Sequence, residues 1–336
     1  MVRRMALVVL ASGLVACGGT GTSSSAPTSA PPSTAATATG SPSSEPTPTE
    51  EPSPNVVASV PTRGAVLSAF DSIWVQERQD GSIWRLDRRG KVLGKIPHAV
   101  RAIEHFGVDT FTLAAGYGSV WGLTDGAVVR IDPDTDRTVA RVPVPAHAFA
   151  LAVGREGVWV SCCSNGLPDL IQIDPDTNDA HVVREMQVSP SSFAVGNGFV
   201  WWGDFSEAGA MQRFDPATGQ EVRIEAANMR FIVPTPRWTW LIAADGSTQR
   251  VAAASVQPAM DAGRKAPLAI GATEAGGTVW INAGDVIGFD ASTGKIEHRI
   301  ALGTVRYQAS GGIAVLGERV WVAQPARNRV IGVPIG

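Results

Sequence analysis

The sequence has few charged residues and few cysteines for its length. Asp, Glu, Lys and Arg make up 18% of the 336 residues, and the formal net charge at pH 7 is −3. A chain so close to neutral lacks the basic surface that binds nucleic-acid phosphates. Three cysteines are too few for a disulfide framework. These absences exclude a nucleic-acid-binding protein and a disulfide-stabilised scaffold, whereas a hydrophobic content of 44% is ample for a large core.

The motifs of common enzyme classes are missing as well. The sequence has no G-x-S-x-G, no H-E-x-x-H, no P-loop and no G-x-G-x-x-G between a strand and a helix. Its five histidines, at positions 98, 105, 147, 181 and 298, are too scattered to indicate a metal-binding cluster. We therefore expect no metal and no other cofactor. Residue types suited to hydrolysis are present, but their spacing points to no particular chemistry.

Residues 1–16 have the organisation of a bacterial secretion signal. Two arginines precede the apolar run 5–11, which is too short to span a bilayer, since a span takes about 20 residues. The following LVAC segment, ending at Cys17, resembles the lipobox of bacterial lipoproteins. The resemblance implies cleavage before Cys17, lipidation of Cys17 and attachment to the extracytoplasmic face of the bacterial cell membrane. The alternative is an ordinary cleaved signal peptide.

Residues 17–55 predict a disordered tether. After Cys17 this segment contains only Gly, Ser, Thr, Ala and Pro, apart from three glutamates and one asparagine. Such a composition offers nothing large and apolar to bury, so it cannot form a core. The tether would separate a folded domain, residues 56–336, from the membrane.

The folded part carries an internal repeat of about 40 residues, marked by a tryptophan between apolar residues. The seven copies lie at Trp74, Trp121, Trp159, Trp201, Trp240, Trp280 and Trp321. Motifs such as VWV are strong strand formers. In four copies a turn signature of the Asp-Pro-x-Thr type follows, beginning at Asp132, Asp174, Asp215 and Asp290. We expect these aspartates to cap their own turns rather than to act as paired catalytic carboxylates.

This pattern predicts an all-β fold, a seven-bladed β-propeller with four short strands in each blade. The last copy ends one strand short of a blade. The start of the domain, the NVVASVPT segment at 55–62, reads like the outermost strand of other copies. We therefore expect this N-terminal strand to complete the last blade and close the ring.

The alternation of VWV with IDPxT is similar to the YVTN/NHL-type seven-bladed propellers of bacterial surface proteins, over roughly residues 55–336. The resemblance implies the propeller fold and a role as a non-catalytic platform that binds a protein, a peptide or a glycan. It also implies that ligands bind on the face made by the loops before the innermost strands and after the tryptophan strands.

The loops that enter the innermost strands carry residues suited to a polar or anionic ligand. These candidates are Glu104, His105, His147, Ser191, Arg230, Arg306, Tyr307 and Gln308. Asp204, at the exit of a tryptophan strand, joins the same candidate ligand face. The alternative is an ordinary solvated propeller face, on which a histidine such as His147 is merely hydrogen-bonded.

Several aromatic residues and histidines have an expected position in this fold. The seven repeat tryptophans should pack between neighbouring blades. Trp84, Trp202 and Trp238 fall outside the pattern, so we expect them to be partly exposed, and one of them could bind a ligand. His181 and His298 are expected on the surface of outer strands.

Cys162 and Cys163 are adjacent, and in an oxidising compartment they could form a vicinal disulfide. Their Cα atoms would lie about 3.8 Å apart, below the usual disulfide range, so the bridge would be strained. The alternative is a pair of reduced, buried thiols. A bridge would form a rigid platform on the ligand face.

A second hypothesis for the function is a propeller lyase of the streptogramin-lyase type. That family opens a cyclic depsipeptide with a histidine, a glutamate and a divalent metal, for which His147 and Glu104 are the candidates. Its repeats lack the Asp-Pro-x-Thr turn, however, and its members are not expected to carry a lipobox. The sequence therefore favours the binding platform.

Overall fold

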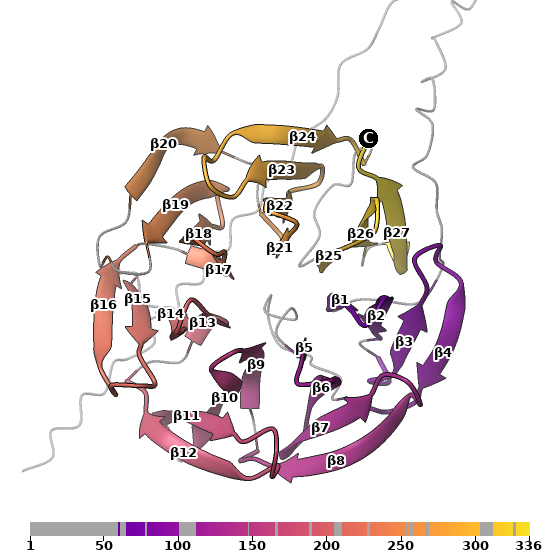
Figure 1. The fold of residues 1–336 in the computed structure, drawn as a ribbon, viewed down its shortest axis with the longest axis vertical. Helices are drawn as coiled ribbons and strands as arrows, with labels where there is room; N and C mark the ends of the chain where they lie inside the picture. Colours follow the sequence, from indigo (N-terminus) through magenta and orange to yellow (C-terminus); the bar gives the residue numbers. More distant parts are fainter. Residues whose placement is uncertain are drawn as a thin grey trace, which may run out of the picture. The chain divides into compact units, whose positions relative to one another are not determined.

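The computed structural model describes residues 60, 65–77, 79–100, 112–146, 148–164, 167–187, 190–204, 210–226, 229–252, 255, 259–265, 269–302, 312–324 and 327–336. These residues belong to one compact unit, Glu50–Gly336. They form seven antiparallel sheets arranged in a ring, a seven-bladed β-propeller (Figure 1). The predicted all-β fold is confirmed. No helix within these ranges is both long and apolar enough to cross a bilayer. The signal peptide, Cys17 and the tether lie outside the described residues.

Each blade is a meander whose strands follow one another from the centre of the ring outward. The innermost strands are β1 (Val66–Ala69), β5 (Leu113–Gly116), β9 (Ala148–Gly154), β13 (Pro190–Gly196), β17 (Met229–Pro234), β21 (Gly271–Ala275) and β25 (Ile313–Leu316). The second strands are β2 (Ser72–Gln76), β6 (Ser119–Thr124), β10 (Gly157–Ser164), β14 (Phe199–Asp204), β18 (Trp238–Ala243), β22 (Thr278–Asn282) and β26 (Arg319–Gln324).

The outer half of each blade completes the meander. The third strands are β3 (Ile83–Leu86), β7 (Ala127–Asp132), β11 (Leu167–Ile173), β15 (Ala210–Phe214), β19 (Ser247–Ala252), β23 (Val286–Asp290) and β27 (Arg329–Pro334). The fourth strands are β4 (Val92–Ile96), β8 (Arg137–Pro143), β12 (Ala180–Glu185), β16 (Glu221–Glu225), β20 (Ala259–Lys265) and β24 (Ile296–Ile300). Blades are numbered in chain order, so that blade 1 is β1–β4 and blade 7 is β25–β27.

Blade 7 has three strands among the described residues. The segment predicted to supply its fourth strand, residues 55–62, lies outside the described residues except for Val60. Val60 is only 2% exposed. It packs in one apolar cluster with Val330 of blade 7 and Ile73 of blade 1. This burial puts Val60 at the junction of the last and first blades, although the pairing of a closing strand stays a prediction.

The seven repeat tryptophans lie in the second strands and are at most 2% exposed, as predicted. Apolar clusters join adjacent blades around them; Trp121 of blade 2, for example, packs with Val160 and Ile171 of blade 3. Burying a side chain of this size contributes more to stability than any other apolar residue of the repeat. The tryptophan period is therefore the period of the hydrophobic core.

Two of the expected surface positions are wrong. Trp202 is 1% exposed and packs beside Trp159 and Phe193, because both faces of a blade are covered by neighbouring blades. His298 is half-buried and stacks on Trp280, with ring centroids 5.0 Å apart. Trp84 and Trp238 are partly exposed and His181 is exposed, as expected.

The Asp-Pro turns are held by their own backbone, as predicted. Asp132 Oδ1 accepts the backbone N–H groups of Asp134 and Thr135, each at 2.9 Å. The corresponding aspartates at 174, 215 and 290 accept backbone N–H groups in the same way. Hydroxyl hydrogen bonds from Thr293 and Ser292 help to lower the pKa of Asp290 to about 2. These carboxylates are structural, since their lone pairs serve the turn.

Arginines on the third strands join neighbouring blades. Arg130 lies opposite Trp121 in the sheet, and its guanidinium carbon is 5.0 Å from the indole centroid. Its Nη1 donates to the carbonyl of Pro175, at 2.6 Å, and to Asn178 Oδ1, at 3.2 Å, both in the next blade's turn. Equivalent arginines reach the next blade from blades 1, 4 and 5, namely Arg85, Arg213 and Arg250. We call these four residues the arginine clasps.

Blade 3 has no arginine clasp, because Gln172 lies opposite Trp159. Gln172 donates to the carbonyl of Glu156 in its own blade, at 3.1 Å. We expect Gln172→Arg to raise the free energy of unfolding by about 1 kcal/mol, because a charged donor would reach the turn of blade 4. Urea unfolding of the variant measures this gain. Gln172→Lys is the matched control, since lysine lacks the planar fork and should give no gain; an arginine variant no more stable than the lysine variant would contradict the prediction.

Candidate functional site

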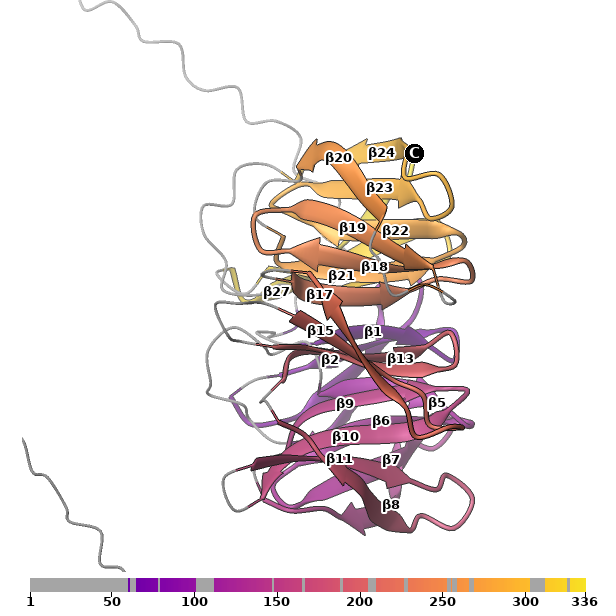
Figure 2. The same cartoon turned by 90° about the vertical axis from the view of Figure 1, so that its left-hand side faces the viewer.

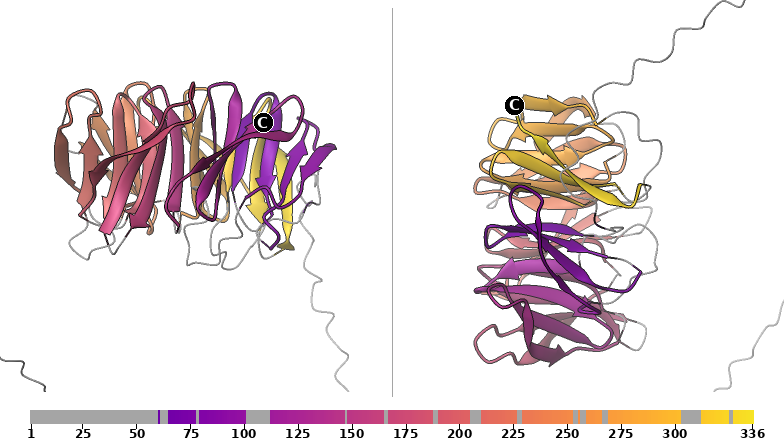
Figure 3. Two further views of the ribbon diagram at one scale, coloured as in Figure 1. Left: turned by 90° about the horizontal axis from the view of Figure 1, so that it is seen from below. Right: turned by 90° about the vertical axis from the view of Figure 1, so that its right-hand side faces the viewer.

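The loops of the propeller gather at two opposite edges of the ring, which the edge-on views show (Figure 2, Figure 3). One edge carries the hairpins between first and second strands and the turns between third and fourth strands; we call it the hairpin edge. The other carries the loops that precede the innermost strands and those that follow the tryptophan strands; we call it the loop edge. The ligand face predicted from the sequence is the loop edge.

Most of the predicted ligand-face residues lie outside the described residues. These are Glu104, His105, His147, Arg306, Tyr307 and Gln308. Asp204 ends β14, but its side chain is outside the described part as well. Arg230 is described in full, on β17. The grouping of these residues into one site therefore stays a prediction.

Three adjacent innermost strands contain a β-bulge close to the loop edge. In β9 the register skips Phe149, in β13 it skips Ser191, and in β17 it skips Arg230. A bulge leaves its extra residue out of the ladder and re-aims the side chain, and bulges are common beside binding and active sites. Ser191 and Arg230 were candidates from the sequence. Phe149 was missed, because in the sequence it reads as an ordinary strand residue.

Phe149 and Arg230 give this edge an aromatic surface and a cation. Phe149 is 39% exposed, which is high for a phenylalanine on an innermost strand. Arg230 is half-buried, and burial lowers the pKa of its guanidinium. The group stays protonated, because arginine titrates far above neutral pH. Such a pair suits a ligand that has both an anionic group and an apolar part.

The cysteine pair lies next to the first of these bulges. Cys162 is completely buried in β10, and its backbone pairs with Ala148, which precedes Phe149. Cys163 is opposite Pro168 of β11, and its side chain is outside the described residues. The vicinal disulfide stays a prediction. Its place would be directly behind the bulge that presents Phe149.

The described residues include no group of three or more His, Cys, Asp or Glu side chains placed to hold a metal ion. The two candidates for a metal-assisted lyase, Glu104 and His147, lie outside this part of the chain. The geometry of the loop edge therefore supports recognition of a ligand rather than a defined reaction.

No protein-family model matches the sequence, and no curated protein matches it significantly. Several solved structures resemble the propeller. A streptogramin B lyase has a TM-score of 0.62 and 11% identity, covering 84% of this chain and 96% of its own. The Pan2 WD40 domain of Neurospora crassa has a TM-score of 0.59 and 13% identity, covering 82% of this chain and 90% of its own. PorZ of Porphyromonas gingivalis, described as a bacterial surface component of the type-IX secretion system, has a TM-score of 0.56 and 11% identity, covering 84% of this chain and 38% of its own. At such identities the likeness establishes the fold alone.

Proposed function

We propose that this protein is a lipid-anchored, extracytoplasmic propeller that binds a protein, peptide or glycan at the loop edge of its ring, without catalysing a reaction. The observation that carries the proposal is the run of three bulges in adjacent innermost strands β9, β13 and β17. Bulges cost ladder hydrogen bonds, and three at one edge of one fold are best explained by the side chains that they present. The lipobox-like sequence before Cys17 and the tether support the membrane anchoring.

The chemistry of the ligand follows from the two described side chains at these bulges. Arg230 favours a carboxylate or another anionic group, since a guanidinium donates paired hydrogen bonds to such groups. Phe149 favours an apolar or flat group beside it. A peptide or protein segment with an acidic residue next to an apolar one has both features. An acidic glycan would satisfy the cation and stack a sugar face on the ring.

A photocrosslinker at position 149 tests this proposal in intact cells of the protein's own host. We expect the full chain with benzoylphenylalanine in place of Phe149 to capture one partner, and Arg230→Gln to reduce the yield at least tenfold. The matched control places the crosslinker at Val139, an apolar residue of the outer strand β8 that is 58% exposed. Equal capture at both positions, or capture that Arg230→Gln leaves unchanged, would show that the loop edge is not the binding surface.

One observation favours a second candidate function. The streptogramin B lyase shares the fold at a TM-score of 0.62, and the residues for such chemistry, Glu104 and His147, precede innermost strands at the same edge. A lyase would open a cyclic depsipeptide lactone in the presence of a divalent metal. Turnover that is lost in His147→Ala would establish this function, and no turnover with any divalent metal would leave the binding platform.

A further inference from the structure

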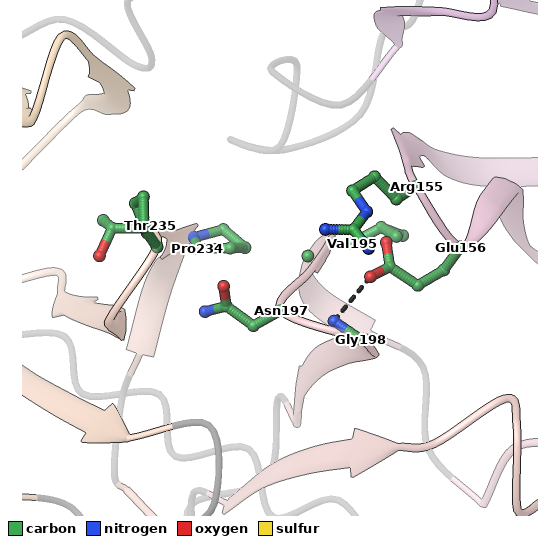
Figure 4. Close-up of a pocket in the computed structure, with 9 residues that line it drawn as sticks. Arg155, Glu156, Val195, Asn197, Gly198, Pro234 and Thr235 are labelled. Carbon is green, nitrogen blue, oxygen red and sulfur yellow. Dashed lines mark hydrogen bonds between the residues drawn. The ribbon is translucent and has the colours of Figure 1, made fainter.

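Three adjoining hollows on the hairpin edge meet at the hairpin between β9 and β10. Their volumes are about 660, 500 and 270 Å³, and Arg155 lines all three. In the largest, Arg155 and Glu156 lie on one side and Pro234 and Thr235 on the other, with Asn197 between them (Figure 4). The hollows therefore form an arc over blades 2 to 5 whose centre is Arg155.

The β9–β10 hairpin turns differently from its neighbours. The hairpins of blades 2 and 4 turn through left-handed pairs such as Asn197-Gly198, with φ of +59° and +87°. Neither Arg155 nor Glu156 has a positive φ, and Gly157 takes φ of +121° instead. Glu156 Oε1 accepts the backbone N–H of Gly198 in blade 4, at 2.6 Å. The carboxylate beside Arg155 is thus engaged in joining two blades.

Arg155 is exposed, and its guanidinium forms no hydrogen bond or ion pair with any other residue that the structure describes. The other polar groups of the arc are engaged. The Tyr117 hydroxyl donates to the carbonyl of Gly154, at 3.0 Å, and the Asn197 amide donates to Thr239 Oγ1, at 3.1 Å. Among the described residues that line the two larger hollows, Arg155 is the single cation.

The walls beside Arg155 are apolar and built of closely packed strand ends. Ala115, Val153, Val195 and Pro234 line the two larger hollows. Asp174 lines only the smallest hollow, so an anion has no carboxylate of blade 3's turn to oppose it in the larger two. An apolar trough with one unengaged guanidinium fits a chain that is apolar along its length and ends in one negative charge.

We propose that this arc binds the carboxylate end of an apolar chain, with the carboxylate on Arg155 and the chain along Val195 and Pro234. The site lies at the opposite edge of the ring from Phe149 and Arg230, so it is independent of the binding surface proposed above. A fatty acid and the C-terminus of an apolar peptide share this chemistry. Each methylene buried in the trough increases the affinity by up to about fourfold.

Calorimetric titration of the full chain carrying Cys17→Ser tests the site with two probe series. The first is hexanoate, octanoate and decanoate; the second is acetyl-Ala-Val-Pro-Val as the free acid and as the amide. We expect saturable binding with a dissociation constant on the order of a millimolar or tighter. Affinity should rise along the fatty-acid series if a lipid is the natural ligand, and the free acid should bind at least tenfold more tightly than the amide if a peptide is.

Two variants locate the site. Arg155→Gln should weaken binding of the successful probe at least tenfold, and it should fold normally because the guanidinium bonds to no other described residue. Arg137→Gln, on the exposed outer strand β8, is the matched control and should leave binding unchanged. Absence of binding in both series, equal binding of acid and amide with no chain-length dependence, or binding that Arg155→Gln does not weaken would overturn the proposal. None of these outcomes bears on capture at position 149.

Discussion

Replacing Arg130 with methionine is expected to lower the free energy of unfolding by about 2–3 kcal/mol. Arg130 donates to Ser119 Oγ, at 2.8 Å, within its own blade. It also donates to the Pro175 carbonyl and to Asn178 across the junction with blade 3. Methionine keeps the apolar contact with Trp121 but leaves these acceptors without their charged donor. The loss should therefore exceed that of an ordinary surface arginine.

Urea or thermal unfolding of the variant gives this difference directly. Arg88→Met is the matched control, because Arg88 also forms an ion pair, with Asp71 at 2.7 Å, but both side chains are more than 60% exposed. An exposed pair contributes little, so the control should change stability by less than about 0.5 kcal/mol. Equal losses in the two variants would mean that the clasp contributes no more than a solvated ion pair.

Gly116→Ala is expected to lower the free energy of unfolding by about 1–3 kcal/mol. A Cβ atom at position 116 would lie 2.4 Å from Val153 Cγ1 of the next blade, a distance that real contacts do not reach. Both residues end innermost strands, where blades 2 and 3 converge on the centre of the ring. Relief of the clash must therefore shift one blade against the other.

A double-mutant cycle separates this clash from a general effect of the alanine. Val153→Ala removes Cγ1, and the remaining nearest atom, Val153 Cβ, would lie 3.6 Å from the alanine Cβ at position 116, an ordinary contact. We expect the double variant to be more stable than the sum of the single losses predicts, by about 1 kcal/mol or more. Strictly additive losses would show that the backbone, not the contact between blades, disfavours alanine at this position.

The blade number and core of this fold could be predicted because one residue type marks every repeat. Tryptophans some 40 residues apart, in strand-forming contexts, identify both the second strand of each blade and its buried face. The same reasoning failed at Trp202, because alternation along a strand predicts one exposed face. In a propeller the neighbouring blades cover both faces, so Trp201 and Trp202 are both buried although they point in opposite directions.

The features that carry the candidate sites have no periodic signal. A bulge shifts the register by one residue without changing the composition of the strand, so Phe149 could not be distinguished from Phe193 in the sequence. Arg155 was missed for a related reason, since a hairpin residue without a motif attracts no attention. A signal did exist, because Arg155-Glu156 occupies the hairpin position that holds Tyr-Gly and Asn-Gly in the adjacent blades.

The arginine clasps have a consequence for how the repeat tolerates change. Their shared acceptor in the next blade is a main-chain carbonyl, which every amino acid supplies. Arg130 uses the carbonyl of a proline, whereas Arg213 and Arg250 use those of Ser255 and Ser292. The receiving blade can therefore lose its Asp-Pro signature, as blade 5 has, and keep the bond. Selection on the donor alone lets the seven copies drift apart in sequence while the ring keeps its shape.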